Sequence, residues 1–348
     1  HRSTKTPDIY VSPNGNDQTG DGSAQKPFKS LARAKEAVRS LPKTGDIVVE
    51  FADGFYEMTE TVEFGVEDSG NENCTIYYQA APGATPILSG GKKITGTWEI
   101  ADDVTWLTGG LKAYKTTLER NGKLRAIYVN GERANMTEKT NVRPINDTTN
   151  IPRYSFYASG EPQYKPEEFY VAGQHCTNET AHIIRNQPWI WQDCLNVIGG
   201  TKFSTADLPP DTRNPQNIEL SAKVGAKWVW PLACVAKTEV DPADPSRTIA
   251  HLQMPYNALA QNMDWGTAYS RTNTHVIYNV FEHLEKPGDF YFDEANKTLY
   301  YIPRAGESME SAEVIIPELV HLIDIGGNVE HGSYVTNITF SGLTFSHA

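Results

Sequence analysis

The close spacing of the apolar segments after residue 46 constrains the fold of this chain more than any other feature. Short strand-like segments lie at residues 47–51, 55–58, 61–64, 75–80 and 86–91, with turns rich in Gly, Pro, Asn and Asp between them. These intervals are too short for the crossover helices that normally join parallel strands. If the strands are parallel, they must therefore wind directly into a solenoid whose coils stack on one another.

One amphipathic helix precedes these strands. Ser30 is suited to cap its N-terminus, and Pro42 and Gly45 end the pattern. The apolar residues that recur at helical spacing are Leu31, Ala34, Val38 and Leu41. A helix lying across the first coil would cover the unpaired backbone and the apolar cross-section of that coil. The sequence therefore predicts a mainly β chain, a right-handed parallel β-helix with an N-terminal capping helix.

The pattern changes between residues 98 and 310, where the strands alternate apolar and polar residues and Trp, Tyr and Pro are frequent. Residues 290–292 and 299–301 flank a polar turn, which predicts a hairpin. Such alternation is typical of an antiparallel sheet or sandwich. Solenoid-like segments resume with residues 312–317. We therefore predict three parts: the cap and first β-helix coils at 1–97, an inserted antiparallel β-sandwich-like domain at 98–310, and resumed, truncated β-helix coils at 311–348.

The charge balance and the lack of long apolar runs limit the class of protein. The chain has 31 Lys and Arg residues against 43 Asp and Glu residues, a net charge of -12, and no basic cluster with interleaved aromatic residues. A nucleic acid is therefore a poor candidate partner. No run of about 18 apolar residues occurs, so we predict no membrane span.

Asn-x-Thr sequons are more frequent than the composition predicts, which indicates a eukaryotic secretory route. We therefore expect a secreted, extracellular glycoprotein whose export signal has been removed. A sixth sequon, at Asn337, lies in an apolar strand-like stretch, where a buried side chain could not hold a glycan. The predicted glycosylation sites are the other five: Asn73, Asn135, Asn146, Asn178 and Asn296.

The four cysteines include no CxxC pair and no zinc-type spacing, and the sequence contains no P-loop, GxGxxG or HExxH motif, so we predict no metal site and no cofactor. Cys176 and Cys194 lie 18 residues apart in one strand-rich stretch and are the favoured disulfide pair, although spacing alone does not prove the pairing. For Cys74, a buried free thiol is an equally good prediction. Cys234 is the fourth cysteine.

Two parts of the sequence resemble known proteins. YVSPNGNDQTGDGSAQKPFKSLARAKEAV, residues 10–38, is similar to the entry and capping helix of extracellular β-helix proteins, including polysaccharide lyases and glycoside hydrolases. More specific are YNVFEHLEKPGDFYFDEANKTLYYIPRAGESMESAEVIIPELVHLIDIGG, which starts at residue 278, then VTNITFSGLTF, together with IYVNGERANMTE from residue 127. This combination resembles glycoside hydrolase family 141 and its β-helix relatives, in which a β-sandwich-like insertion interrupts the early coils.

The resemblance implies the N-terminal part of a secreted glycoside hydrolase that acts on cell-wall polysaccharide. The catalytic carboxylates of the family would lie in coils beyond residue 348. The family's second Arg-rich stretch is replaced here by NMTEKTN, which leaves Arg133 as the main cation for contacting a substrate.

Other candidate residues follow from the chemistry of sugar recognition and cleavage. Aromatic rings pack against the C–H faces of sugars, and the loop DWGTAYSRT offers Trp265, Tyr269 and Arg271 in a polar context. Glycoside hydrolysis requires two carboxyl groups. Within the chain the weak catalytic candidate is Asp324, between Ile323 and Ile325 on a solenoid strand, although it fits a solvent-facing residue equally well.

Two other functions remain open: a non-catalytic carbohydrate-binding or structural β-helix module, and a polysaccharide lyase. Carbohydrate is the expected partner in each case. A β-helix that stops at FSHA without a capping element would expose an apolar coil face. We therefore expect the remaining C-terminal β-helix segment, or a second chain, to pack on residues 337–348.

Overall fold

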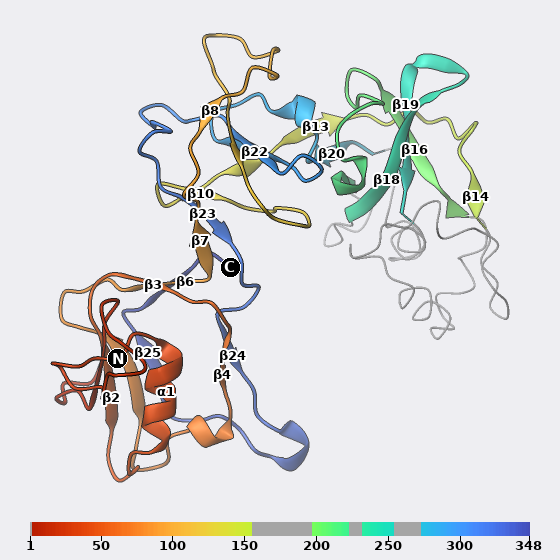
Figure 1. Cartoon of the computed structure of the whole chain (residues 1–348). Coiled ribbons are helices and arrows are strands. Elements are labelled where there is room, and N and C mark those ends of the chain that lie inside the picture. Colours follow the sequence, from red (N-terminus) through yellow and green to blue (C-terminus); the bar gives the residue numbers. More distant parts are fainter. Residues whose placement is uncertain (1, 155–196, 223–231, 254–272) are drawn as a thin grey trace. The chain divides into compact units, whose positions relative to one another are not determined.

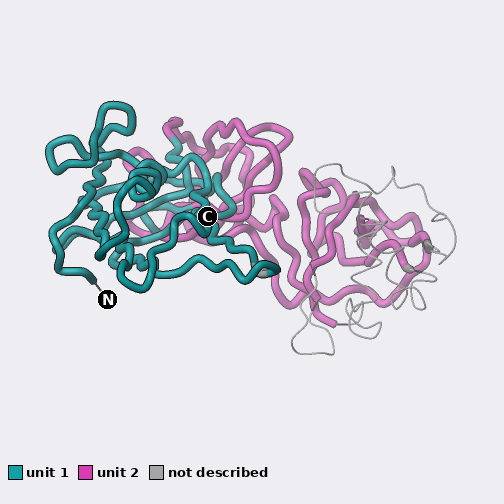
Figure 2. The backbone as a smooth tube through the Cα atoms, turned by 90° about the horizontal axis from the view of Figure 1, so that it is seen from below, with its two compact units in different colours: residues 1–94, 128–131, 313–348 teal, residues 95–127, 132–312 magenta. Residues whose placement is uncertain are grey.

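The computed structural model describes residues 2–154, 197–222, 232–253 and 273–348, and its secondary structure is mainly β (Figure 1). The chain forms two compact units, coloured separately in Figure 2. Unit 1 consists of His1–Ile94, Tyr128–Gly131 and Glu313–Ala348, and unit 2 consists of Thr95–Ile127 and Glu132–Ala312. No helix within the described ranges is long and apolar enough to cross a membrane.

Unit 1 contains three sheets in which every strand pairs in parallel with its neighbours. The first has the order β1-β2-β5-β25, the second pairs β24 with β4, and the third has the order β26-β6-β3. Their bounds are β1 Ile9–Val11, β2 Ile47–Phe51, β3 Phe55–Glu57, β4 Val62–Phe64, β5 Ile76–Ala80, β6 Ile87–Ser89, β24 Ile323–Ile325, β25 Ile338–Ser341 and β26 Thr344–Ser346. The predicted short strands before residue 90 are therefore confirmed to within one or two residues at each end.

Parallel pairing in register places similar side chains above one another in the core of unit 1. Tyr78 on β5 is the ladder partner of Phe340 on β25, and the two rings stack with their centroids 5.4 Å apart. Phe64 on β4 meets both rings edge-on, at 5.5 Å from each. Because each aromatic pair adds about 0.5–1.5 kcal/mol beyond area burial, these contacts tie the first and second sheets together.

The helix α1, Leu31–Arg39, lies against the same core, as predicted (Figure 1). The Ser30 hydroxyl accepts a hydrogen bond from the Arg33 amide at 3.1 Å, which is the expected N-cap. Leu31, Ala34 and Val38 are buried in the apolar core that the parallel strands form. The helix thus covers apolar surface that the first strands would otherwise expose to water.

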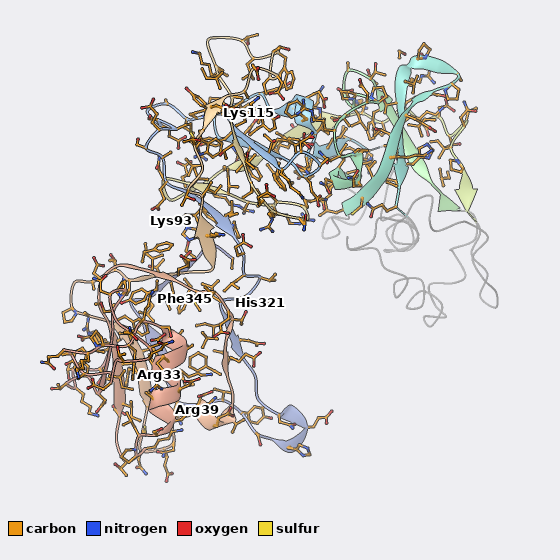
Figure 3. All side chains as sticks on the ribbon, viewed as in Figure 1. Arg33, Arg39, Lys93, Lys115, His321 and Phe345 are labelled. Carbon is orange, nitrogen blue, oxygen red and sulfur yellow. The ribbon has the colours of Figure 1, made fainter. Side chains whose placement is uncertain are left out.

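Arg39 at the C-terminal end of α1, labelled in Figure 3, binds the buried carboxylate of Asp68. Its Nε lies 2.6 Å from Oδ1 and its Nη2 lies 2.9 Å from Oδ2. Burial by itself raises the pKa of Asp68, but the hydrogen bonds from Arg39 and from the Gly65 amide outweigh it and hold that pKa below its usual value. Asp68 ends the short 3-10 helix η1, Val66–Asp68, so this ion pair anchors the helix to the turn after β4.

A second pattern in unit 1 is antiparallel. β23, Val314–Pro317, pairs antiparallel with β7, Gly91–Lys93, and with β10, Tyr128–Val129. The prediction that residues 312–317 belong to the resumed parallel coils was therefore wrong. A short apolar run has the same appearance in a parallel coil and in a buried antiparallel strand, so its partner cannot be recognised from the run itself.

Unit 2 is built from two larger sheets. The five-stranded sheet has the order β12-β21-β22-β9-β8, and the six-stranded sheet has the order β13-β20-β17-β18-β19-β16. All ladders in the six-stranded sheet are antiparallel, whereas β12 runs parallel to β21. The predicted hairpin is confirmed, because Phe290 faces Tyr301 and Phe292 faces Leu299 across β21 and β22.

The bounds of these elements complete the description. The five-stranded sheet contains β8 Glu99–Ile100, β9 Tyr114–Thr117, β12 Asn135–Met136, β21 Asp289–Asp293 and β22 Thr298–Tyr301. The six-stranded sheet contains β13 Glu138–Val142, β16 Gly200–Ser204, β17 Glu219–Ala222, β18 Leu232–Asp241, β19 Asp244–Leu252 and β20 His275–Tyr278. Smaller elements are β11 Glu132–Arg133, β14 Arg153–Tyr154, β15 Val197–Ile198, η3 Pro215–Asn217, η4 Phe281–His283 and η5 Val329–His331.

Replacing Ser30 with alanine removes the N-cap of α1. We expect Ser30→Ala to lower the free energy of unfolding by about 1 kcal/mol, because an amide of the first turn loses its acceptor. Thr44→Ala, in an exposed turn after the helix, serves as the control and should change stability by less than about 0.5 kcal/mol. Chemical denaturation of both variants measures the difference, and equal losses would contradict the capping role.

Candidate functional site

Asp324 has a carboxylate neighbour that the sequence does not reveal. On β24 it is the direct ladder partner of Glu63 on β4, and both side chains are exposed. Ladder partners in a parallel sheet point to the same face, and neighbouring strands lie about 4.8 Å apart. The two carboxylates therefore project side by side from the outer face of the β4–β24 sheet, while Val62 and Phe64 on either side of Glu63 point into the core.

This pair has the residue types and backbone spacing that glycoside hydrolysis uses. A retaining mechanism needs two carboxyl groups about 5–5.5 Å apart, which ladder partners can reach. Both side chains are exposed to water, however, and electrostatic catalysis is strongest where water is excluded. A catalytic role for Asp324 therefore requires an element that covers this face, and it stays a prediction.

The structure does not bring the predicted substrate-binding residues together. Arg133 lies on β11 in unit 2 with an exposed side chain, and its backbone carbonyl accepts a hydrogen bond from Arg304 Nη2 at 2.7 Å. Trp265, Tyr269 and Arg271 lie outside the described residues, as do both cysteines of the predicted disulfide, Cys176 and Cys194. Their roles stay predictions. Cys74 is a buried free thiol, one of the two alternatives that the sequence left open.

Every sequon asparagine within the described residues is exposed. The five are Asn73, Asn135, Asn146, Asn296 and Asn337, whereas Asn178 lies outside the described residues. The expectation that Asn337 is buried was wrong. Asn337 has a φ of 56°, so it turns the chain immediately before β25 and its side chain stays in solvent, although the apolar residues that follow face the core. Exposure makes glycosylation sterically possible at these positions and does not test occupancy.

Asp293 and Asp289 on β21 are carboxylates with structural partners. Asp293 is fully buried and accepts hydrogen bonds from Asn214 Nδ2 at 2.9 Å and from Asn296 Nδ2 at 2.9 Å. Asp289 accepts from the Lys286 amide at 2.9 Å and so closes the turn before β21, and burial raises the pKa of Asp289. These contacts explain both carboxylates as parts of the hairpin scaffold.

Arg213 is the centre of a polar cluster in unit 2 that no sequence pattern predicts. Its guanidinium lies over the Phe281 ring at 3.8 Å from the centroid and binds Asp103 and Tyr300 at 3.1 and 3.0 Å. The Tyr300 hydroxyl donates to Asp103 at 2.7 Å, and burial, aided by that carboxylate, raises the pKa of Tyr300 to about 12. An arginine suits this position because its planar guanidinium stacks on the Phe281 ring and at the same time donates hydrogen bonds from both terminal nitrogens.

Two further buried charges belong to the six-stranded sheet. Glu219 on β17 is buried and paired with Lys123 at 2.9 Å and with Arg125. Lys202 on β16 is completely buried and lies 2.6 Å from Asp241 and 2.9 Å from Asp147. Each charge is neutralised by partners distant in sequence, so these groups stabilise the scaffold of unit 2 and none is left to serve as a reactive group.

Across residues 2–154, 197–222, 232–253 and 273–348, no three His, Cys, Asp or Glu side chains are grouped in a way that could hold an ion.

Comparison with known proteins identifies a fold relative. No protein-family model matches the sequence, and no curated protein matches it. A solved structure described as "Glycoside hydrolase" matches 99% of this chain with a TM-score of 0.67 and 20% identity, and this chain covers 51% of it. A second solved structure, "The complex structure of XylC with xylose", matches 98% of this chain, which covers 35% of that structure. Its identity is 12% and its TM-score is 0.36, which is too low to indicate a shared fold. The chain therefore has a glycoside hydrolase-like, mainly β fold and spans about half the length of the glycoside hydrolase that it matches.

The buried charges of unit 2 predict a pH-dependent stability. The hydrogen bond from Lys202 holds the pKa of Asp241 below its usual value, so the stabilisation from this pair is present above about pH 4 and is lost as the pH falls. Lys202→Met leaves Asp241 buried without a cation, and we expect a loss of about 3 kcal/mol at neutral pH.

Urea unfolding between pH 3 and pH 8 tests this expectation. The difference between the wild type and Lys202→Met should shrink as the pH falls, because protonated Asp241 no longer needs the cation. Lys237→Met, an exposed lysine of the same sheet, is the matched control and should have little effect at any pH. A difference that stays constant with pH would show that the loss comes from packing.

Proposed function

We propose that the chain is the N-terminal portion of a secreted glycoside hydrolase that acts on cell-wall polysaccharide and whose catalytic carboxylates lie beyond residue 348. The observation that supports it most is the arrangement of unit 1 as three parallel sheets whose ladders stay in register over successive strands. The glycoside hydrolase-like fold of the chain is consistent with it. We also propose that carbohydrate contacts Arg133, Trp265, Tyr269 and Arg271.

The order of the strands supports a right-handed β-helix. The chain visits the three sheets in a fixed sequence: β2, β3 and β4, then β5, β6 and β24, then β25 and β26. Within each sheet, every new strand pairs with the strand of the preceding coil, as in a solenoid. In this arrangement the residues of unit 2, Thr95–Ile127 and Glu132–Ala312, are inserted into the second coil, between its second and third strands.

The last strands in this order support the proposal that further coils, or a second chain, pack on residues 337–348. β24, β25 and β26 each lie at the edge of their sheet. Phe345, labelled in Figure 3, is 39% exposed although its ladder partner Leu88 is 1% exposed. Ile325 is 54% exposed although its partner Phe64 is 1% exposed. Side chains that point toward the core, yet remain exposed, are positioned to be covered by another coil.

Enzymatic assay of the native protein, with whatever sequence follows residue 348, tests the activity. We expect it to release reducing ends from neutral cell-wall polysaccharides, whereas the 348-residue chain alone should be inactive because it lacks the catalytic carboxylates. Ultraviolet-absorbing unsaturated products from uronate polymers would instead identify a lyase. A native mass of 38.6 kDa plus glycans, with no companion chain and no activity, would identify a non-catalytic module.

Substitution of Phe345 tests the packing proposal separately. In the 348-residue chain, Phe345→Asp should lower the free energy of unfolding by only about 1 kcal/mol, because the ring is 39% exposed and its loss removes one edge-on contact with Phe340. In the native protein the same change should cost about 3 kcal/mol, because it places a charge under a covering coil. Ile100→Asp, at an exposed apolar residue of unit 2, is the control and should behave alike in both proteins. An equally small effect of Phe345→Asp in both would contradict the packing.

A further inference from the structure

Unit 1 contains a cavity of about 620 Å³ beside the N-terminus of α1. Its volume lies within the range of about 300–1,000 Å³ that is usual for small-molecule sites. The deeper wall is apolar and buried, and is formed by Leu31, Tyr56, Val62 and Leu88. A ligand in this cavity would therefore place an apolar face against the protein.

The mouth of the cavity is polar. Lys29, Glu57, Thr59 and Glu60 line it and are exposed, so hydrogen-bonding groups surround an apolar floor. Phe55, which is half-buried, stands between floor and mouth, on the same outer face of β3 as Glu57. An aromatic side wall with carboxylates near it suits a ligand that has both C–H faces and hydroxyl groups.

The walls are held in place before any ligand binds. Asp17 accepts hydrogen bonds from the amides of Lys29 and Ser30 at 2.7 and 3.0 Å, which fixes the 12–17 loop to the start of α1. The Tyr56 hydroxyl donates to the carbonyls of Val11 and Ala52 at 3.1 and 2.7 Å. A preorganised cavity loses little conformational entropy when it binds, which favours specific recognition.

The Phe55 ring is also held in position, in its case by a cation. The ammonium of Lys93, labelled in Figure 3, lies 4.6 Å from the ring centroid. Lys93 is in turn paired with Glu313, so its charge is compensated within unit 1 and does not add to that of the cavity.

Charge decides which sugars fit. Three carboxylates, those of Asp17, Glu57 and Glu60, line the cavity against one lysine, Lys29. A uronate or another anionic ligand would be repelled, whereas the hydroxyls of an uncharged sugar can donate to the carboxylates. We propose that this cavity binds an uncharged oligosaccharide. The inference goes beyond the proposed function and does not depend on hydrolysis.

Methionine methyl resonances offer a direct test, because Met58 lines the cavity. The 348-residue chain, labelled with 13C-methyl methionine, is titrated with cellotetraose, xylotetraose, mannotetraose and tetragalacturonate. We expect at least one neutral tetrasaccharide to shift the Met58 signal, assigned with Met58→Leu, while the signal of Met309, a buried residue of unit 2, stays unchanged. Tetragalacturonate should leave Met58 unchanged. If no neutral sugar shifts Met58, or if tetragalacturonate binds as tightly as the neutral sugars, the proposal is overturned.

Charge reversal at the mouth tests the selectivity. Glu57→Lys combined with Glu60→Lys should weaken binding of the neutral tetrasaccharide by about threefold to tenfold, because charge-assisted acceptors are lost. The same variant should now bind tetragalacturonate. Glu72→Lys, an exposed glutamate that does not line the cavity, is the matched control and should keep the wild-type preference. Unchanged selectivity in the double variant would overturn the proposal.

The two proposals fail independently in these experiments. Binding is measured at Met58 without any cleavage, so an inactive protein with an occupied cavity would contradict only the proposed hydrolase function. An active hydrolase whose Met58 signal responds to none of the neutral sugars would contradict only the cavity proposal.

Discussion

The antiparallel pairing of β7 with β23 is the constraint on which the rest of unit 1 depends. The chain leaves unit 1 after Ile94, re-enters it for Tyr128–Gly131 and returns at Glu313, and the Ile94 amide donates to the Val314 carbonyl at 2.8 Å. Only after this return can β24 and β25 reach β4 and β5. Thr61 and the carbonyl of His321, labelled in Figure 3, are hydrogen-bonded although 260 residues separate them. Closing a loop of that length costs about 5 kcal/mol if the loop is unstructured.

An insertion whose two ends pair with each other reduces this cost. Once β7 and β23 are joined, with Gly91 opposite Pro317, the closure between Thr61 and His321 spans about 34 residues instead of 260, because unit 2 no longer counts as free chain. The close approach also has a steric requirement. A Cβ at Gly91 would lie 2.5 Å from Ile315 Cγ2 and 2.9 Å from His347 Cβ, so only glycine fits beside β23. The coil can therefore accommodate the insertion because Gly91 has no side chain and lets β7 pair closely with β23.

How much of the fold and of the candidate site can be predicted from the sequence depends on how far apart in the chain the interacting residues lie. The helix and its cap were predictable because Ser30, Leu31, Ala34 and Val38 interact within a few residues of one another, and the hairpin was predictable because a polar turn joins its strands. The orientation of β23 was not, since its partners lie more than 180 residues earlier. The same holds for Arg213, whose ring and carboxylate partners come from three separate segments, and for the Lys202 pair. Neither the hydrophobic pattern nor the secondary-structure propensity of a sequence predicts which distant charged residues will be buried together.

The pairing of Asp324 with Glu63 shows how a β-helix could assemble a catalytic site that one coil cannot contain. Parallel ladders keep a given side-chain position on the same face from coil to coil, with a step of about 4.8 Å. The same rule applies to the coils proposed beyond residue 348. Carboxylates on adjacent coils of one ladder would stand at about the separation of a retaining pair, and carboxylates two coils apart, at roughly 9.6 Å, would stand at the upper limit for an inverting pair. The stereochemical outcome would then depend on which of these separations the later coils use, and on how far those coils exclude water.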